Sequence, residues 1–598
     1  MAYTQGFLQL RALTTPLRVS PKWELRTAKP NRIVCKAQNE DVEDSDATNL
    51  SLLSRRLALG TALIGGAAAA GTKASPAGAV DIAPSVEPPP TTIPSYDNEE
   101  YPASIVDALS LNRTSFPEGF IFGTASSAYQ YEGAASKDGR EASVWDTFTH
   151  EHPEKIDDGS NADVAIAEYY RYVEDIKIMK DMNLDAYRFS ISWSRILPNG
   201  KPGENEEGVN KKGIEYYNKL INHLIANGLE PYVTLFHWDT PQALETEYGG
   251  FASRRIIDDF RNYAQICFKY FGDRVKHWIT LNEPWAYSRE GYSVGLFAPG
   301  RCSPQQDPTC LGGNSATEPY IVTHNLLLAH AAAVDEYRKE YKESQNGEIG
   351  ITLISRWFEP HDPDSEEDKN AAKRALDFLF GWYMEPLASG KYPQTMRDRV
   401  GDRLPEFTDE ESTLVAGSYD FLGLNYYTTN YAANETAPGP FPSYEYDAGV
   451  RYLTEREGIP VGTPTGSSWL FVCPKGFKEL LLYVKEKYHN PLIYITENGR
   501  GNDINEETLE DALLDTYRID YYYRHLYYLL SAIREDVNVK GYFAWSLFDN
   551  FEWKNGYLVG FGLYHVDRND NLKRRAKLSG KWFQTFLQKP QQKPSLKG

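Results

Sequence analysis

The stretch Tyr494-Ile495-Thr496-Glu497-Asn498-Gly499 decides the fold prediction. It follows a short apolar run at 491–493 and precedes a polar loop that begins at Arg500. Short apolar, β-branched runs of this kind predict a buried strand, and this one ends in a carboxylate. A second stretch, Trp278-Ile279-Thr280-Leu281-Asn282-Glu283-Pro284, has the same build.

The two predicted strands each present a glutamate, Glu283 or Glu497, at the carboxyl end. A TIM barrel places its catalytic groups at strand ends of this kind. Two facing carboxyl groups are also the minimum requirement for hydrolysis of a glycosidic bond. The alternative is that each glutamate is only an ion-paired strand terminus. Two glutamates in the same Asn-flanked setting favour the catalytic interpretation.

Short apolar runs alternate with amphipathic segments from Phe116 onward. The predicted strands are Phe120–Ala128, Ala186–Ser192, Pro231–Phe236, His277–Glu283, Ile349–Ser355, Phe421–Tyr427, Leu492–Glu497 and Gly541–Leu547. The predicted helices are Asp163–Met182, Lys211–Asn227, Ser253–Phe271, Glu318–Tyr341, Asp368–Leu387, Gly476–Tyr488 and Asp511–Glu535. This alternation predicts an α/β protein with a single (β/α)8 TIM barrel over residues 116–590, followed by a tail at 591–598. The Pro-, Gly- and Tyr-rich insertion Thr436–Ser468 predicts a long loop that shapes a substrate cleft.

Composition excludes several classes of function. A net charge of −20 argues against a nucleic-acid or anionic-membrane partner. The aromatic content of 13% suits the stacking of sugar rings, although a large aromatic core would give the same figure. Five scattered cysteines are too few for a metal cluster or a disulfide scaffold. The basic run Lys573, Arg574, Arg575 and Lys577 is interpreted as a solvated surface turn.

The composition of the first 80 residues predicts an organelle-targeting sequence. Up to Lys36 the only acidic residue is Glu24. The bases there are Arg11, Arg18, Lys22, Arg26, Lys29, Arg32 and Lys36. This composition is typical of a transit peptide, and Ile33-Val34-Cys35-Lys36-Ala37 resembles a plastid processing site. We therefore expect import into a plastid, the chloroplast in green tissue.

A second signal follows the first. Ser54-Arg55-Arg56-Leu57, an apolar run to Ala70 and Ala77-Gly78-Ala79 resemble a twin-arginine export signal, which predicts transfer to the thylakoid lumen. An Ala-rich disordered segment is the alternative. The run is too short and too rich in glycine for stable membrane insertion. Residues 81–115, with Pro88-Pro89-Pro90, predict a linker.

Polar and aromatic side chains gather at the predicted strand ends. They are Gln130, Arg188, His237, Asn282, Glu283, Asn425, Tyr427, Glu497, Trp545, Glu552 and Trp553. A sugar would find donors and acceptors for its hydroxyl groups among them, and an indole for its flat face. His237 has no Cys or His at ligand spacing, so we expect no metal site there, and the predicted chemistry needs no cofactor.

Several motifs resemble glycoside hydrolase family 1. They are Phe122–Gln130, Thr280–Pro284, Ala298–Cys302, Ile495–Gly499 and Asn550–Trp553. The similarity covers about Phe116 to Leu587 and looks like that of a plant β-glucosidase of the plastid-targeted type. It implies retaining hydrolysis of a terminal β-D-glucosyl residue from an O-glycoside with a bulky aglycone, a plant secondary metabolite. The two carboxyl groups of such an enzyme lie about 5 Å apart.

The resemblance also implies a role for each matching residue. Glu497 would be the nucleophile and Glu283 the general acid/base, while Arg188 and Tyr427 would keep the nucleophile ionised. The substrate-binding residues would be Gln130, His237, Asn282, Asn425, Glu552, Trp553 and Phe561, with Trp545 as the floor and Trp469 as the aglycone platform. Cys302 and Cys310 would form a disulfide around a short loop, leaving Cys267 and Cys473 as thiols.

Departures from related enzymes narrow the class of glycoside that the enzyme would cleave. Glu283 stands where thioglucosidases carry Gln, which favours an O-glycosidase, and Glu552-Trp553 argues against a phospho-glycosidase. Arg500-Gly501 looks unusual for the family and puts the aglycone-side contacts in doubt.

A transglucosidase would use the same glutamates and pass the glucosyl group to an alcohol instead of water. The intact pair argues against an inactive sugar-binding barrel. We expect a small-molecule β-glucoside as partner, and a homo-oligomer stays open.

Overall fold

The computed structural model describes residues 110–503 and 508–589. The predicted transit peptide and twin-arginine signal, most of the linker and the tail at 591–598 lie outside the described residues. Barrel contacts begin slightly before the predicted boundary at Phe116, because Arg113 pairs with Asp185 at 2.7 Å.

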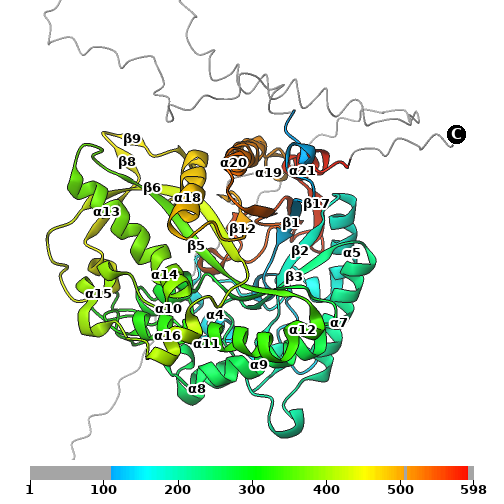
Figure 1. The fold of residues 1–598 in the computed structure, drawn as a ribbon. Coiled ribbons are helices and arrows are strands. Elements are labelled where there is room, and N and C mark those ends of the chain that lie inside the picture. Colours follow the sequence, from blue (N-terminus) through cyan, green and yellow to red (C-terminus); the bar gives the residue numbers. More distant parts are fainter. Residues whose placement is uncertain (1–109, 504–507, 590–598) are drawn as a thin grey trace, which may run out of the picture. The chain divides into compact units, whose positions relative to one another are not determined.

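Eight parallel strands close into a barrel, which confirms the predicted (β/α)8 fold (Figure 1). The strands pair in chain order from β1 to β6, then through β12 and β14 back to β1. They are β1 Ile121–Ala125, β2 Ala186–Ser190, β3 Glu230–Phe236, β4 His277–Asn282, β5 Glu348–Pro360, β6 Leu422–Asn434, β12 Ile493–Asn498 and β14 Val539–Ala544.

Helices follow every barrel strand and surround the barrel (Figure 1). They are α5 Glu168–Asp181, α7 Lys211–Ala226, α9 Ile256–Phe271, α11 Glu318–Glu336, α13 Glu366–Leu376 with α14 Trp382–Ser389, α18 Pro474–Lys487, α20 Thr516–Arg534 and α21 Leu578–Phe586. Helix α9 illustrates why they form, since Ile256, Phe260, Tyr263 and Phe271 recur at helical spacing and are all buried. Helix α21 completes the eighth strand–helix pair and was absent from the predicted helices.

Several element boundaries differ from the prediction. Strand β1 ends at Ala125, and the rest of the predicted strand turns into the short helix α3, Ala128–Tyr131. Strands β5 and β6 extend further than predicted and pair with each other as far as Pro360 and Ala432. The end of β6 also pairs antiparallel with β7, Val450–Leu453. The insertion after β6 therefore contains strands, and it rises from the carboxyl ends of the barrel strands.

The interpretation of Lys573–Lys577 as a solvated turn is wrong. These residues form β17, Lys573–Ala576, which pairs antiparallel with β16, Tyr564–Asp567. The Arg574 side chain is buried and makes bonds of 2.8 and 2.9 Å to the two carboxylate oxygens of Asp175. Lys577 is also buried and donates to Asp549 at 2.7 Å. The basic run therefore holds the last hairpin to the barrel.

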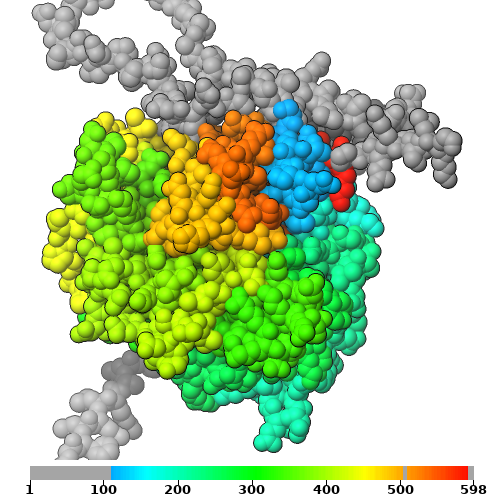
Figure 2. Space-filling model, in the orientation of Figure 1, coloured from blue at the N-terminus to red at the C-terminus, as the bar shows by residue number. Residues whose placement is uncertain are grey.

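The first described residues pack against the last helix. In Figure 2 the blue segment at the start lies on the surface beside the orange residues of the α20 region. Phe116 contacts Phe586 of α21 with ring centroids 6.2 Å apart, and Arg113 donates to the carbonyl of Leu587 at 3.4 Å. The two ends of the barrel sequence thus meet. Among residues 110–503 and 508–589, no helix combines the length and apolarity needed to cross a membrane.

Replacing Arg574 with leucine should destabilise the barrel strongly. The substitution leaves the Asp175 carboxyl buried without its cation, which costs about 3–5 kcal/mol of unfolding free energy. Burial already raises the pKa of Asp175 to about 6 in the presence of Arg574. Removal of the Arg574 charge raises the pKa of Asp175 further, so the loss should be largest at alkaline pH, shrink as pH falls toward about 6 and level off below it. Urea unfolding at pH 5 and pH 8 measures both effects.

The matched control is Arg575→Leu on the same strand. Arg575 pairs with Asp567 and Asp570 but is partly exposed, so its loss should cost about 0–1 kcal/mol. Equal losses for the two variants, or a loss for Arg574→Leu that does not depend on pH, would contradict the role assigned to the Arg574–Asp175 pair.

Candidate active site

The two strands that end in glutamate are irregular near their carboxyl ends. In β12 the register against β6 shifts between Ile495 and Glu497. In β4 the register against β5 shifts between Ile279 and Asn282. A bulge of this kind re-aims side chains that would otherwise alternate between the two faces of a strand. As a result Thr496 and Glu497, although adjacent, both contact side chains of the same polar cluster.

Glu497 is held by a cation and a phenol. Arg188 of β2 donates to one carboxylate oxygen at 2.6 Å, and Tyr427 of β6 donates to the other at 2.8 Å. Arg188 is fully buried and Glu497 nearly so. A carboxylate that accepts bonds from a guanidinium and a phenol is stabilised in its ionised form. The structure thus brings Arg188, Tyr427 and Glu497 together.

Asn282 links this group to the second glutamate. Its side-chain oxygen accepts from Arg188 at 2.6 Å and from Asn425 at 3.3 Å. The same Asn425 amide donates to Glu283 at 2.6 Å. Thr496 fixes the orientation of Asn425 by donating to its oxygen at 2.7 Å. One continuous network therefore reaches both glutamates.

Glu283 lies in a strained and buried position. Its φ of 43° is left-handed, and it precedes helix α10, Pro284–Tyr292. Burial, and then the negative charge of Glu497, raise the pKa of Glu283 to about 8, although the bond from Asn425 opposes them. Trp238 and Trp553 are also left-handed, with φ values of 72° and 50°. Such residues cost about 1–3 kcal/mol each and cluster at functional sites.

The same network fixes the proton on His237. Because the Asn282 oxygen is occupied by Arg188, its NH2 group must be the donor to His237 Nε2 at 3.0 Å. Nε2 is then the acceptor, and the ring proton lies on Nδ1. Burial and the positive charge of Arg188 hold the pKa of His237 well below its usual range. Neutral His237 therefore keeps Nδ1–H, which is buried and has no partner, as a donor for a ligand.

Gln130 and Glu552 supply acceptors. Gln130 uses its NH2 group on Asn550 and on the Phe551 carbonyl, at 3.0 and 2.9 Å, and its oxygen accepts from Ser127 at 2.6 Å. Only its oxygen can take a further bond. One carboxyl oxygen of Glu552 is buried and has no partner. Burial, and then the charge of Glu497, raise the pKa of Glu552 to about 8.

Tryptophans form the wall around these polar groups. The His237 ring stacks on Trp545 and on Trp553, with centroids 6.2 and 5.8 Å apart. Trp553 also packs on Trp238 at 4.5 Å. Trp238 donates its indole N–H to the Asn282 carbonyl at 2.8 Å, so this wall is tied to the network. Indole faces of this kind suit the apolar faces of a sugar ring.

Two further aromatic residues contact the phenol that binds Glu497. Trp469 and Phe561 contact the Tyr427 ring edge-on, at 5.9 and 6.0 Å. Phe561 is buried, whereas Trp469 is 37% exposed and offers a free surface. Arg500 instead stacks over Tyr517 at 4.6 Å, away from this group. The structure therefore brings Trp469, and not Arg500, into contact with Tyr427.

Glycine at 499 is required by packing. A Cβ atom added to Gly499 would lie 1.8 Å from the Trp545 carbonyl oxygen. The backbone of β12 and the segment after β14 therefore touch directly. This contact sets the distance between the strand that carries Glu497 and the tryptophan beside His237.

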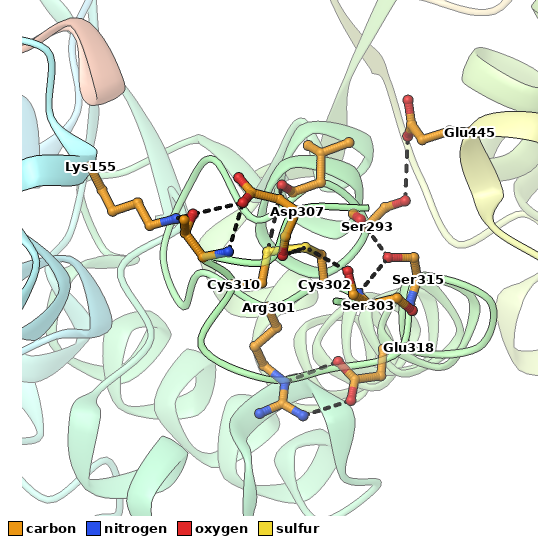
Figure 3. Close-up of a disulfide and its surroundings, with 12 residues drawn as sticks. Lys155, Ser293, Arg301, Cys302, Ser303, Asp307, Cys310, Ser315, Glu318 and Glu445 are labelled. Carbon is orange, nitrogen blue, oxygen red and sulfur yellow. Dashed lines mark hydrogen bonds and ion pairs between the residues drawn. A yellow bond between two sulfur atoms is a disulfide. The ribbon is translucent and has the colours of Figure 1, made fainter. Parts of the chain in front are cut away.

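The predicted disulfide Cys302–Cys310 is confirmed (Figure 3). It closes a loop, and Arg301, next to Cys302, binds Glu318 at the start of α11 with bonds of 2.9 and 2.6 Å. Lys155, from a segment far away in the sequence, donates to Thr309 within the loop at 2.6 Å. Cys267 is buried and forms no disulfide, and the same is true of Cys473.

Residues 112–592 match the model of glycosyl hydrolase family 1. The chain belongs to this family. A family 1 enzyme hydrolyses glycosides with retention by means of two carboxyl groups. Within the described residues, no group of three or more His, Cys, Asp or Glu side chains is arranged to hold a metal ion.

Plant family 1 enzymes are close relatives. The chain is 58% identical to "Beta-glucosidase 12" of Oryza sativa, over 80% of this chain and 94% of the relative. It is 54% identical to an isoflavonoid 7-O-beta-apiosyl-glucoside beta-glycosidase of Dalbergia nigrescens, over 83% and 89%. A solved structure of a rice β-glucosidase variant, in a covalent complex with Glc, matches with a TM-score of 0.78 and 52% identity, covering 80% of this chain and all of that one.

The roles of some residues in the site were not predicted. Thr496 orients Asn425, Asn550 and Ser127 fix Gln130, and Trp238 joins the aromatic wall to Asn282. Each lies within one to three residues of a predicted site residue. Their proximity in sequence was the available signal, but the register shifts and turns that aim them are visible only in the structure.

Proposed function

We propose that the chain is a retaining β-glucosidase in which Glu497 is the nucleophile and Glu283 the general acid/base. The observation that carries the proposal is the difference between the two carboxyl groups. Glu497 is stabilised as a carboxylate by Arg188 and Tyr427. Glu283 has a raised pKa of about 8 and holds its proton at neutral pH. One group is thus ready to attack and the other to protonate.

The reaction takes two steps. In the first, Glu497 attacks the anomeric carbon while Glu283 gives its proton to the glycosidic oxygen, so the C–O bond breaks and the aglycone leaves as an alcohol. The glucosyl ester that forms no longer carries the Glu497 charge. Because that charge helps to raise the pKa of Glu283, its loss makes Glu283 a carboxylate suited to act as a base. Glu283 then deprotonates water, which attacks the ester and restores the β configuration.

The remaining residues position the glucose. His237 offers a donor at Nδ1, Gln130 offers an acceptor, and the unpartnered carboxyl oxygen of Glu552 can bond a hydroxyl group in either protonation state, so hydroxyl groups on one side of the sugar find complementary partners. Trp545 and Trp553 provide apolar surface beside them. Family membership and the Glc complex of the rice relative support this assignment.

Glu497→Gln should abolish turnover. The amide cannot form the glucosyl ester, so kcat on 4-nitrophenyl β-D-glucoside should fall by several orders of magnitude. Incubation of the wild-type enzyme with a 2-deoxy-2-fluoro-β-D-glucoside, followed by peptide mass spectrometry, should find the label on Glu497. Normal activity in the variant, or a label on another residue, would refute the nucleophile assignment.

Activity should fall as pH rises through about 8, because the general acid must hold its proton in the first step. The pH profile of kcat/KM for an alkyl β-glucoside measures this decline, which is the alkaline limb of the profile. In Glu283→Gln the limb should disappear when 2,4-dinitrophenyl β-D-glucoside is used, since this leaving group needs no proton. A limb that persists in the variant would assign the titration to Glu552 instead.

The exposed face of Trp469 supports a bulky, apolar aglycone. Loss of this surface should cost roughly 1–3 kcal/mol of transition-state binding. Trp469→Ala should therefore lower kcat/KM about 5- to 150-fold for a bulky glucoside, and less for a small aryl glucoside. Glucose inhibition should barely change. Equal losses on all substrates with a lowered melting temperature would instead make Trp469 a purely structural residue.

We also propose plastid import and, through Arg55 and Arg56, transfer to the thylakoid lumen. The transit-peptide composition and the paired arginines support this proposal. A fluorescent fusion of the full chain should appear in the lumen, and Arg55→Lys with Arg56→Lys should leave it in the stroma. Lumenal accumulation of the double variant would contradict the twin-arginine step, and absence from plastids would contradict both.

A further inference from the structure

A cavity of about 190 Å³ is lined by residues of α10, β5 and the insertion after β6, and it lies near enough to Glu283 for that charge to act on Arg356. It is lined by the aromatic side chains Trp285, Phe358, Tyr444 and Tyr452, by Leu379 and Ala448, and by the charged side chains of Arg289, Arg356 and Glu445. Helix α10 connects it to the site, because Trp285 lies two positions after Glu283. From the other side, the Arg356 guanidinium lies 5.7 Å from the centre of the Trp469 ring.

The walls of this cavity are fixed. Trp285 donates its indole N–H to the Tyr444 hydroxyl at 2.6 Å, and Tyr444 in turn donates to the Phe378 carbonyl at 2.8 Å. Arg289 lies over the Trp285 ring at 5.4 Å. A rigid aromatic cavity that adjoins the Trp469 surface continues the path that an apolar aglycone would follow from the glucose.

The two arginines of the cavity differ in their partners. Arg289 pairs with Glu290 and, at 2.6 Å, with Glu445, so its charge is compensated. Figure 3 shows that Glu445 also accepts a bond from Ser293. Arg356 donates only to the side-chain oxygen of Asn430, at 3.0 Å, and no carboxylate of the described residues forms an ion pair with it.

Among the described residues Arg356 is therefore a cation without an ion-pair partner, whereas the other two charged side chains of the cavity, Arg289 and Glu445, pair with each other. Burial, and then the positive charge of Arg289, lower its pKa to about 10, which still leaves it charged at neutral pH. A guanidinium has five N–H donors in a planar fork that fits a carboxylate. The single bond to Asn430 leaves most of these donors for a ligand.

We propose that this cavity binds the end of the aglycone that is remote from the glucose, and that Arg356 selects aglycones that carry a carboxylate there. The inference rests on the proposed β-glucosidase function and specifies its substrate class. The preferred substrates are glucosides of hydroxy acids whose hydroxyl group bears the sugar and whose apolar or aromatic body ends in a carboxylate.

Matched substrate pairs test the proposal. They are the phenolic β-D-glucosides of 4-hydroxybenzoic acid, 3-(4-hydroxyphenyl)propionic acid and 4-hydroxycinnamic acid, each beside its methyl ester, so that the carboxylate is offered at increasing reach. The readout is the acid-to-ester ratio of kcat/KM in the wild type divided by the same ratio in Arg356→Gln. This double ratio cancels the different leaving-group strengths of acid and ester. For at least one length it should reach about tenfold, because charge-assisted hydrogen bonds to the carboxylate are lost.

Arg451→Gln is the matched control. Arg451 is an exposed cation on β7 that does not line the cavity, so the same loss of net charge should leave the acid-to-ester ratio within about twofold of the wild type. Arg356→Lys keeps the charge without the planar fork and should retain part of the preference. Melting curves and hydrolysis of 4-nitrophenyl β-D-glucoside show whether each variant is folded.

The outcomes separate this proposal from the function on which it rests. A double ratio near one at every length would overturn the role of Arg356 while leaving the β-glucosidase assignment intact. A similar change in Arg451→Gln would attribute any preference to general electrostatics and would also overturn it. Failure of the wild type to hydrolyse 4-nitrophenyl β-D-glucoside would instead refute the proposed function itself.

Discussion

The site depends on one buried guanidinium. Arg188 of β2 reaches across the barrel to bind Glu497 on β12 and Asn282 on β4, both at 2.6 Å. A buried cation is costly unless it is compensated, so these strands must close at a spacing that lets both oxygens reach it. The charge also fixes the direction of every further bond. Asn282 can only donate to His237 Nε2, which leaves the ring proton on Nδ1.

The same interaction gives two chemically identical side chains, Glu283 and Glu497, different environments. Glu497 lies against the cation and Tyr427, whereas Glu283 has a single amide donor and lies near a negative charge. Protonation follows environment, and burial beside the charge of Glu497 raises the pKa of Glu283. The assignment of roles thus requires no difference in residue type. It requires only that one glutamate occupies the side of the barrel where Arg188 lies.

The sequence predicted the barrel because apolar runs and amphipathic segments are local signals. The prediction from sequence was wrong where contacts between residues far apart in the chain decide the structure. Arg574 looked like a surface cation because its partner, Asp175, lies 399 residues away. The extensions of β5 and β6 exist because the two strands pair with each other and with β7 beyond the barrel. Among site residues, those at predicted strand ends or matched by the family motifs were predicted. Thr496 lies within the motif Ile495–Gly499 but was given no role, because the register shift that directs it toward Asn425 is not a local signal.

The contact at Gly499 has a consequence for the evolution of such chains. Any larger residue there would collide with the backbone at Trp545, whether or not the protein is catalytically active. A descendant that lost Glu497 would keep this glycine, and it would keep most of the apolar strand before it, because both are constraints of packing. Much of the sequence signature is therefore inherited through stability rather than through activity. Inactive descendants would still carry this sequence signature. Only the ionisable side chains of the site would distinguish them from active relatives.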